Sequence, residues 1–179
     1  MEPIFHNEHC INMTNRQILL EELHTFRRDL HRYPELSGYE QNTAKRVCRF
    51  LASYHPDTLQ HCIGGAGIVA IYNGSTEGPT VVIRCELDAL PIREMNNFMY
   101  RSINEDVSHK CGHDGHISIV VGLAARLHKE PPARGRVVLL FQPAEETGSG
   151  AERVINDEKF LALQPDYAFA LHNLPGYPL

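Results

Sequence analysis

The sequence lacks the marks of a membrane protein and of a secreted protein. Its strongest uninterrupted apolar run is Val137–Phe141, far short of the roughly 18 residues that a membrane-spanning helix needs. Residues 1–15 contain neither the charged segment nor the apolar segment of a secretory signal. We therefore expect no membrane partner, and the cytoplasm is the expected location.

Cysteine pairs and runs of basic residues are missing as well. The 5 cysteines are an odd number and include no CxxC pair, so a disulfide scaffold is not expected. Lys and Arg number 17 against 22 Asp and Glu, which gives a formal net charge of −5. Without basic runs to neutralise phosphates, the chain is not expected to bind nucleic acid.

Length and composition are those of an ordinary globular protein. The 179 residues correspond to about one domain, or to a large piece of a bigger one. With 42% apolar and 22% charged residues, the chain can bury a core and is not disordered as a whole. Residues 1–14 are expected to form a loose leader ahead of the folded part, residues 15–179.

The spacing of apolar residues divides the folded part into helices and strands. Recurrence at three and four residues predicts helices over Asn15–Tyr33, Glu40–Tyr54, Gly115–Lys129 and Ala151–Leu163. Short runs rich in Val, Ile and Leu predict strands over Gly67–Tyr72, Thr80–Leu87, Arg136–Gln142 and Asp166–Leu171. The turn-rich linker between the first two strands predicts a hairpin. Because the strands show no clean alternation, we predict an α/β fold with a central, mostly parallel sheet flanked by helices on both faces.

Polar residues follow the predicted strands at the points where they end. Asp88 follows the second strand, Glu145-Glu146 the third and His172 the fourth, and the segment HKCGHDGH precedes a helix. In open α/β sheets, ligands bind beyond the carboxyl ends of the strands and at helix N-termini. If the strands are parallel neighbours, these groups converge on one crevice. Thiolate, imidazole and carboxylate are the ligands that zinc, manganese, cobalt or nickel accept.

Residues of the HKCGHDGH segment also have structural interpretations. Cys111 could be a small buried apolar side chain, and His113 and His116 could cap the helix or face solvent. Asp114 is expected to be the helix N-cap, with orientation of a metal ligand as the functional alternative. His109 is expected to be exposed or to support a ligand from the upstream loop.

The carboxylates and the last histidine are ambiguous in the same way. Glu145 and Glu146 could form a solvated acidic step, but adjacent carboxylates can also divide roles between metal ligand and general base. Asp88 could begin a turn, or it could orient a metal-bound side chain. His172 could be satisfied inside the core, yet its place at the end of an apolar strand suits a ligand.

Five segments, in their order along the chain, carry a resemblance to a known family. They read FRRDLHRYPELSGYE, LDALPI, HKCGHDGH, VVLLFQPAEETGSGA and ALHNLPG. From about Glu21 onward, the chain resembles the amidohydrolase branch of the metal-dependent carboxypeptidase and aminoacylase superfamily, with its zinc-exopeptidase-like catalytic domain. That branch includes hippurate hydrolase, N-acyl-amino-acid amidohydrolases and plant hydrolases of indole-acetyl amino acids.

The resemblance implies a role for each polar group. The implied metal ligands are Cys111, His113, Glu146 and His172, with Glu145 as general base and Asp88 as the orienting carboxylate. A two-metal site is usual in the family, with zinc common and manganese, cobalt or nickel accepted. The implied reaction is hydrolysis of the amide bond of N-acyl or aryl-acyl amino acids by a metal-activated water.

Length is where the chain departs from this family. Members are considerably longer and form homodimers, so residues 15–179 are expected to be the N-terminal portion of the catalytic domain, without its C-terminal part and the lid and dimerisation domain. One alternative is a non-catalytic metal-binding remnant or interaction module. Another is a hydrolase in which Cys111 and a nearby histidine form a nucleophilic pair.

Overall fold

The computed structural model describes residues 14–173. Its helices are α1 (Asn15–Arg32), α2 (Gln41–Ala52), α3 (His113–Lys129), α4 (Gly150–Ile155) and α5 (Glu158–Leu161). Its strands are β1 (Thr58–Ile63), β2 (Gly67–Asn73), β3 (Thr80–Glu86), β4 (Arg136–Gln142) and β5 (Tyr167–Ala170). The predicted leader falls almost wholly outside the described residues. Within those residues, no helix combines the length and the apolar character needed to cross a bilayer.

The strands form one mixed sheet in the order β1-β2-β4-β3-β5. β3 pairs in parallel with β4 and β5, whereas β2 runs antiparallel to β1 and β4. The α/β class is confirmed. The predicted hairpin between β2 and β3 is wrong, because β4 lies between them and the linker packs against the turn that precedes β4. There the N–H of Gly74 donates to the carbonyl of Gly135 at 2.7 Å.

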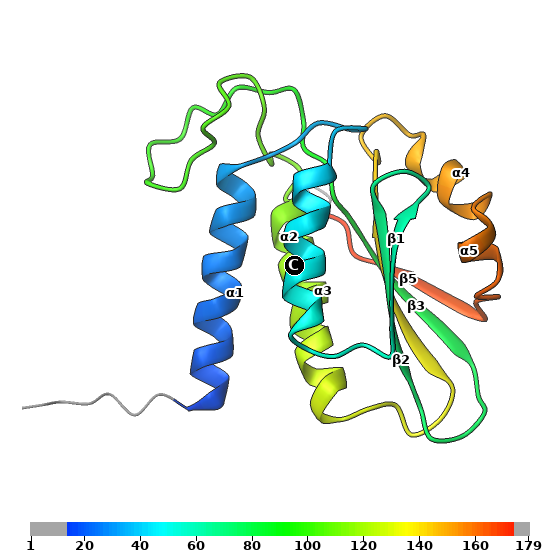
Figure 1. Ribbon diagram of the computed structural model, residues 1–179. Helices are drawn as coiled ribbons and strands as arrows, with labels where there is room; N and C mark the ends of the chain where they lie inside the picture. Colours follow the sequence, from blue (N-terminus) through cyan, green and yellow to red (C-terminus); the bar gives the residue numbers. More distant parts are fainter. Residues whose placement is uncertain (1–13, 174–179) are drawn as a thin grey trace, which may run out of the picture.

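Helices cover both faces of the sheet, as predicted (Figure 1). On one face lie α1, α2 and α3, where Leu30 and Val47 pack into a core with Phe141 of β4. On the other face lie α4 and α5, where Val154 packs with strand residues such as Val138. Two separate apolar cores therefore hold the sheet in place.

The ends of the helices follow from local side-chain hydrogen bonds. α1 begins with a capping box, in which Thr14 accepts from the N–H of Gln17 at 3.3 Å and Gln17 accepts from the N–H of Thr14 at 2.7 Å. The predicted helix over 151–163 is divided in two, since Asp157 caps α5 by accepting from the N–H of Lys159 at 2.9 Å. Asp157 also accepts from the N–H of Gly64, which ties this corner to the turn after β1.

The parallel strands fix where the polar segments meet. Because β3, β4 and β5 are parallel, their carboxyl ends lie at one edge of the sheet. Asp88, Glu145 and His172 each follow one of these strands, and α3 begins beside the same edge. The strand ends and the start of α3 thus bring together groups that are far apart in the sequence.

Candidate metal centre

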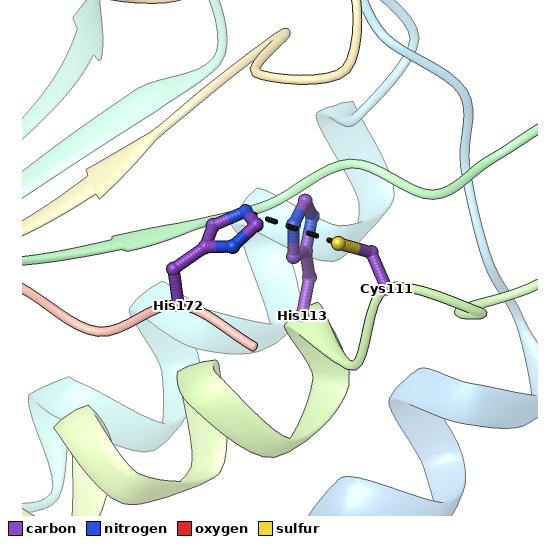
Figure 2. A group of neighbouring side chains, drawn as sticks. All are labelled: Cys111, His113 and His172. Carbon is purple, nitrogen blue, oxygen red and sulfur yellow. Dashed lines mark hydrogen bonds between the residues drawn. The ribbon is translucent and has the colours of Figure 1, made fainter. Parts of the chain in front are cut away.

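His113 lies at the centre of the polar cluster at this edge. Three groups, each with its ligand atoms within 4.8 Å of one another, all contain it. They are Cys111, His113 and His172; Glu86, His113 and His116; and His113, Glu145 and Glu146. Figure 2 shows the first group, with Cys111 on the loop before α3, His113 on the helix and His172 reaching in from the segment after β5.

A hydrogen bond to the backbone sets the tautomer of His113. Its Nδ1 lies 2.8 Å from the carbonyl oxygen of Asp88, so Nδ1 carries the proton and donates. Nε2 is left with a lone pair, and this buried atom has no hydrogen-bond partner within residues 14–173. It lies 3.6 Å from the Glu145 carboxylate and 3.7 Å from that of Glu146. A buried lone pair that faces two carboxylates is the environment that a cation would satisfy.

Asp88 joins His113 to the loop after β4. This buried carboxylate accepts from the Ser37 hydroxyl at 2.6 Å and from the backbone N–H of Glu146 at 3.0 Å. Burial raises the pKa of Asp88, but the hydrogen bonds from His113, Ser37 and the Glu146 backbone outweigh it and lower the pKa to about 2. The carboxylate therefore stays ionised beside the histidine.

The two glutamates are placed by an unusual backbone step. Ala144 adopts a left-handed conformation with φ of 49°, and its N–H donates to the buried carboxylate of Glu40 at 2.8 Å. The carbonyl of Ala144 accepts from the N–H of Gly150 at 2.9 Å, which closes the loop. Within this loop the side chain of Glu145 is 26% exposed and that of Glu146 is 16% exposed. Glu145 is the carboxylate with the better access to solvent.

His172 approaches from the opposite side of the cluster. Its Nδ1 donates to the carbonyl of Asn173 at 2.9 Å, which leaves Nε2 to face the other ligand atoms. Nε2 lies 3.8 Å from the Cys111 sulfur and 3.5 Å from the Glu145 carboxylate. Both histidines thus direct Nε2 toward the other ligand atoms.

The cluster is crowded with negative charge, and the pKa values reflect this. Burial, together with the charges of Glu146 and Glu145, raises the pKa of Cys111 to about 12. Burial and the neighbouring Glu145 raise the pKa of Glu146. Burial lowers the pKa of His113, but the hydrogen bond to Asp88 and the charge of Glu86 raise it overall. Each group holds a proton more tightly than usual, and a divalent cation would replace those protons.

Sequence analysis did not name Glu86 and gave His116 only as a helix cap or a solvent-facing residue, but both lie in the same cluster. Nδ1 of His116 donates to the Glu86 carboxylate at 2.9 Å, and Glu86 lies 4.0 Å from Nε2 of His113. His116 therefore neither caps α3 nor faces solvent. Two signals were available: Glu86 stands two positions before Asp88, and His116 is three positions after His113 on the same helical face.

The N-cap expectation for Asp114 is wrong, and so is the exposed alternative for His109. The N-cap of α3 is Gly112, which adopts a left-handed φ of 88°, and it is not Asp114. The Asp114 carboxylate instead accepts from His31 at 2.9 Å and from Arg27 at 3.1 Å, because it points back toward α1. His109 is buried rather than exposed, and its two ring nitrogens have no partner within residues 14–173.

Comparison with known proteins places this cluster in a family. Residues 82–179, which contain every member of the three groups, match the model of Peptidase family M20/M25/M40. The chain belongs to this family. The predicted relationship to metal-dependent amidohydrolases is thereby confirmed at the level of lineage.

The relatives are enzymes of amide hydrolysis by name. The chain is 36% identical over 154 residues to the N-acetylcysteine deacetylase of Bacillus subtilis (strain 168), and equally to the hippurate hydrolase of Campylobacter jejuni. Each match covers 86% of this chain and 40% of the relative. The solved YXEP protein of Bacillus subtilis, described as a dinuclear metal-binding M20 peptidase, matches with a TM-score of 0.83 and 34% identity. That match covers 93% of this chain and 46% of YXEP. The chain therefore spans less than half the length of these M20 relatives.

Proposed function

We propose that this chain supplies the metal-binding part of an amidohydrolase that cleaves the amide bond of N-acyl or aryl-acyl amino acids. The observation that carries the proposal is His113, which three ligand groups share and whose buried Nε2 has no hydrogen-bond partner within residues 14–173. The names of the deacetylase and the hippurate hydrolase suggest the substrate class. On this proposal residues 15–179 are the N-terminal portion of a catalytic domain, and a homodimeric whole protein would carry the lid and dimerisation domain elsewhere.

The donor set fits a pair of divalent ions. The proposed ligands are Cys111, His113, Glu146 and His172. A thiolate with imidazoles and carboxylates suits zinc, manganese, cobalt or nickel. When bound, such ions lower the pKa of a coordinated water toward about 7 and polarise the substrate carbonyl.

Glu145 is the proposed general base. Its carboxylate faces His113 at 3.6 Å and His172 at 3.5 Å, and it has the better access to solvent of the two adjacent glutamates. The carboxylate takes the proton of the attacking water and later gives it to the leaving nitrogen. The hydroxyl of that water ends on the acyl carbon, so the products are a carboxylic acid and a free amino acid.

Asp88 is proposed to position His113 without touching the substrate. The Asp88 backbone carbonyl accepts a hydrogen bond from Nδ1 of His113, and its ionised side chain accepts one from the backbone N–H of Glu146. One residue thereby orients a histidine from α3 and a glutamate from the loop after β4. A carboxylate in this position also makes the histidine a better metal ligand.

The two alternatives make different predictions. A cysteine hydrolase requires a reactive thiolate at Cys111, whereas a non-catalytic metal-binding module requires no hydrolysis. A cysteine hydrolase needs a thiolate, but the pKa of Cys111 is raised to about 12 and its sulfur is 3.8 Å from His172. Replacing Cys111 by Ser separates the roles, because excess metal restores a weakened ligand and cannot restore a nucleophile. A metal-binding module without catalysis would have the same ligand groups and would show no hydrolysis.

Elemental analysis of the purified chain, paired with hydrolysis assays on hippurate and N-acetylcysteine with added zinc or manganese, tests the proposal. We expect stoichiometric metal that is lost in His113→Ala, together with release of the free amino acid. Metal without hydrolysis, even after the remainder of the catalytic domain is supplied, would favour the non-catalytic module. A folded chain that binds no metal would overturn the proposed centre.

A further inference from the structure

A second polar site lies away from the metal centre, where α1 ends. A cavity of about 590 Å³ is lined there by Arg32 of α1 and by residues of the segment 93–105. Figure 1 shows this segment as the long green loop beside the end of α1. None of the lining residues belongs to the ligand groups around His113. The volume lies within the range of roughly 300–1,000 Å³ that is usual for small-molecule sites.

Three arginines without acidic partners line this cavity. They are Arg32, Arg93 and Arg101, and within residues 14–173 none of them lies within 4.0 Å of a carboxylate. Arg32 donates to the carbonyl of Met99 at 3.3 Å, which holds its guanidinium toward the loop. Unpaired guanidinium groups in one hollow create a positive potential that attracts anions.

The acidic residues of the lining do not cancel this charge. The side chain of Glu94 is 2% exposed and accepts from Lys110 at 2.9 Å, from the N–H of Ser102 at 2.7 Å and from His31 at 3.1 Å. Its negative charge is therefore compensated within its own network. Glu105 is the remaining carboxylate of the lining, against three arginines.

The rest of the lining offers apolar surface. Phe98 stacks on Tyr100 with ring centroids 4.2 Å apart, which fixes one wall of the cavity. Met99 and Ile103 are 93% and 60% exposed, so their side chains are available to a ligand. A ligand that matches both parts of the lining carries an anionic group and an apolar body.

We propose that this arginine pocket (Arg32, Arg93 and Arg101) binds a small organic carboxylate with an apolar body. The planar guanidinium fork matches a carboxylate with two parallel hydrogen bonds, and the apolar lining receives the rest of the molecule. This is a binding site in addition to the proposed hydrolytic centre, and it does not require that centre to be loaded or active.

Benzoate binding to the metal-stripped protein tests the proposal, with isothermal calorimetry as the measurement. Metal is removed because carboxylates also bind metal ions. We expect saturable binding of benzoate and none of the neutral benzamide. Arg93→Ala and Arg101→Ala should each weaken binding about tenfold, and Arg93→Lys should fall between Arg93→Ala and the unaltered protein because it keeps the charge and loses the fork.

Two control variants make the outcome specific. Arg49→Ala removes one exposed positive charge from α2 and should leave benzoate binding unchanged. His113→Ala should also leave it unchanged, which separates this site from the proposed metal centre. Undiminished binding in the Arg93→Ala/Arg101→Ala double variant would overturn the proposal, as would a folded protein without saturable binding at millimolar benzoate. Inorganic phosphate that competes as well as benzoate would overturn the assignment to carboxylates.

Discussion

Two adjacent glutamates at the end of β4 occupy different environments, and this difference decides their expected roles. Glu146 is the less exposed, and burial raises its pKa, whereas Glu145 faces both histidines with better access to solvent. In preparations that hydrolyse hippurate, Glu145→Gln should lower kcat by roughly 10²–10⁴-fold while metal content is retained. Steady-state kinetics and elemental analysis check this. An unchanged kcat would remove Glu145 from the mechanism.

The ionised Asp88 should matter for metal affinity more than for folding. Asp88→Asn keeps the volume and the backbone carbonyl that accepts the hydrogen bond from His113, but it removes the charge beside that ring. We expect metal affinity to fall about 10–100-fold. Competition against a chelator measures it, with Ser37→Ala as a milder control that removes one hydrogen bond to the same carboxylate. Equal affinities in Asp88→Asn and the unaltered protein would contradict a positioning role.

At the scale of secondary-structure elements, two glycines near the centre should respond in opposite ways to the same substitution. A Cβ at Gly150 would overlap the carbonyl oxygen of Pro143, in the loop that presents the glutamates. A Cβ at Gly115, inside α3, would have Arg27 as its nearest neighbour at 4.0 Å. Gly150→Ala should therefore destabilise the fold by more than about 2 kcal/mol, whereas Gly115→Ala should stabilise it by about 0.5–1 kcal/mol.

Urea unfolding of the two glycine variants measures both effects under the same conditions. Gly115→Ala also serves as the control for adding a methyl group near the ligands. If Gly150→Ala unfolds at the same urea concentration as the unaltered protein, the close packing of the loop against Pro143 is not a constraint on the fold.

A buried histidine of α1, His31, makes hydrogen bonds to α3 and to the segment after β3. His31 lies 2.9 Å from Asp114 and 3.1 Å from Glu94, and Arg27, Tyr100 and His109 are further titratable or charged groups near it. The hydrogen bond to Asp114 raises the pKa of His31, burial opposes it, and Glu94 adds to the increase. The folded protein therefore holds this proton more tightly than the unfolded chain does.

This raised pKa predicts a stability that depends on pH. The contribution of His31 is fully present below its unfolded value of 6.5 and is lost as the pH rises through the higher folded value. Urea unfolding at several pH values above 6.5 should show a falling free energy of unfolding that is flatter in His31→Gln. His24→Gln, an exposed position on the same helix, is the matched control and should keep the slope. Parallel profiles for His31→Gln and the unaltered protein would exclude this effect.

At the scale of the whole molecule, the sequence predicts where helices and strands lie better than it predicts which strands pair with one another. β2, β3 and β4 are short apolar runs because they are central strands, and this is what made them visible. β1 is an edge strand in which half of the TLQHCI residues are polar, so it carried no such signal. The pairing of β2 with β4 depends on contacts between distant segments, and a turn-rich linker does not encode it.

The same limit applies to the cluster of polar residues. Its convergence was predictable because polar residues follow strands whose carboxyl ends share an edge. The pair Glu86 and His116 was not assigned, since their spacing to Asp88 and His113 gains meaning only from the contact that joins the two side chains across the fold. Asp114 has the residue type and the approximate position of an N-cap. Its carboxylate instead accepts hydrogen bonds from His31 and Arg27 of α1, so it does not cap α3. Sequence rules based on neighbouring residues fail at such positions, because a buried charged side chain interacts with residues that are distant in the sequence.

A metal ion should stabilise the entire fold, because its proposed ligands come from the loop after β4, the start of α3 and the segment after β5. At about 100 times Kd, an ion that binds only the folded state adds about 2.7 kcal/mol of stability. For a chain of this size that corresponds to a rise in Tm of roughly 5–10 °C. Calorimetric scans of the metal-stripped protein with and without zinc measure it. Glu145→Gln should keep most of the rise and His113→Ala should lose it, because His113 is common to the three ligand groups. A rise of equal size in His113→Ala would mean that the stabilising ion binds elsewhere on the molecule.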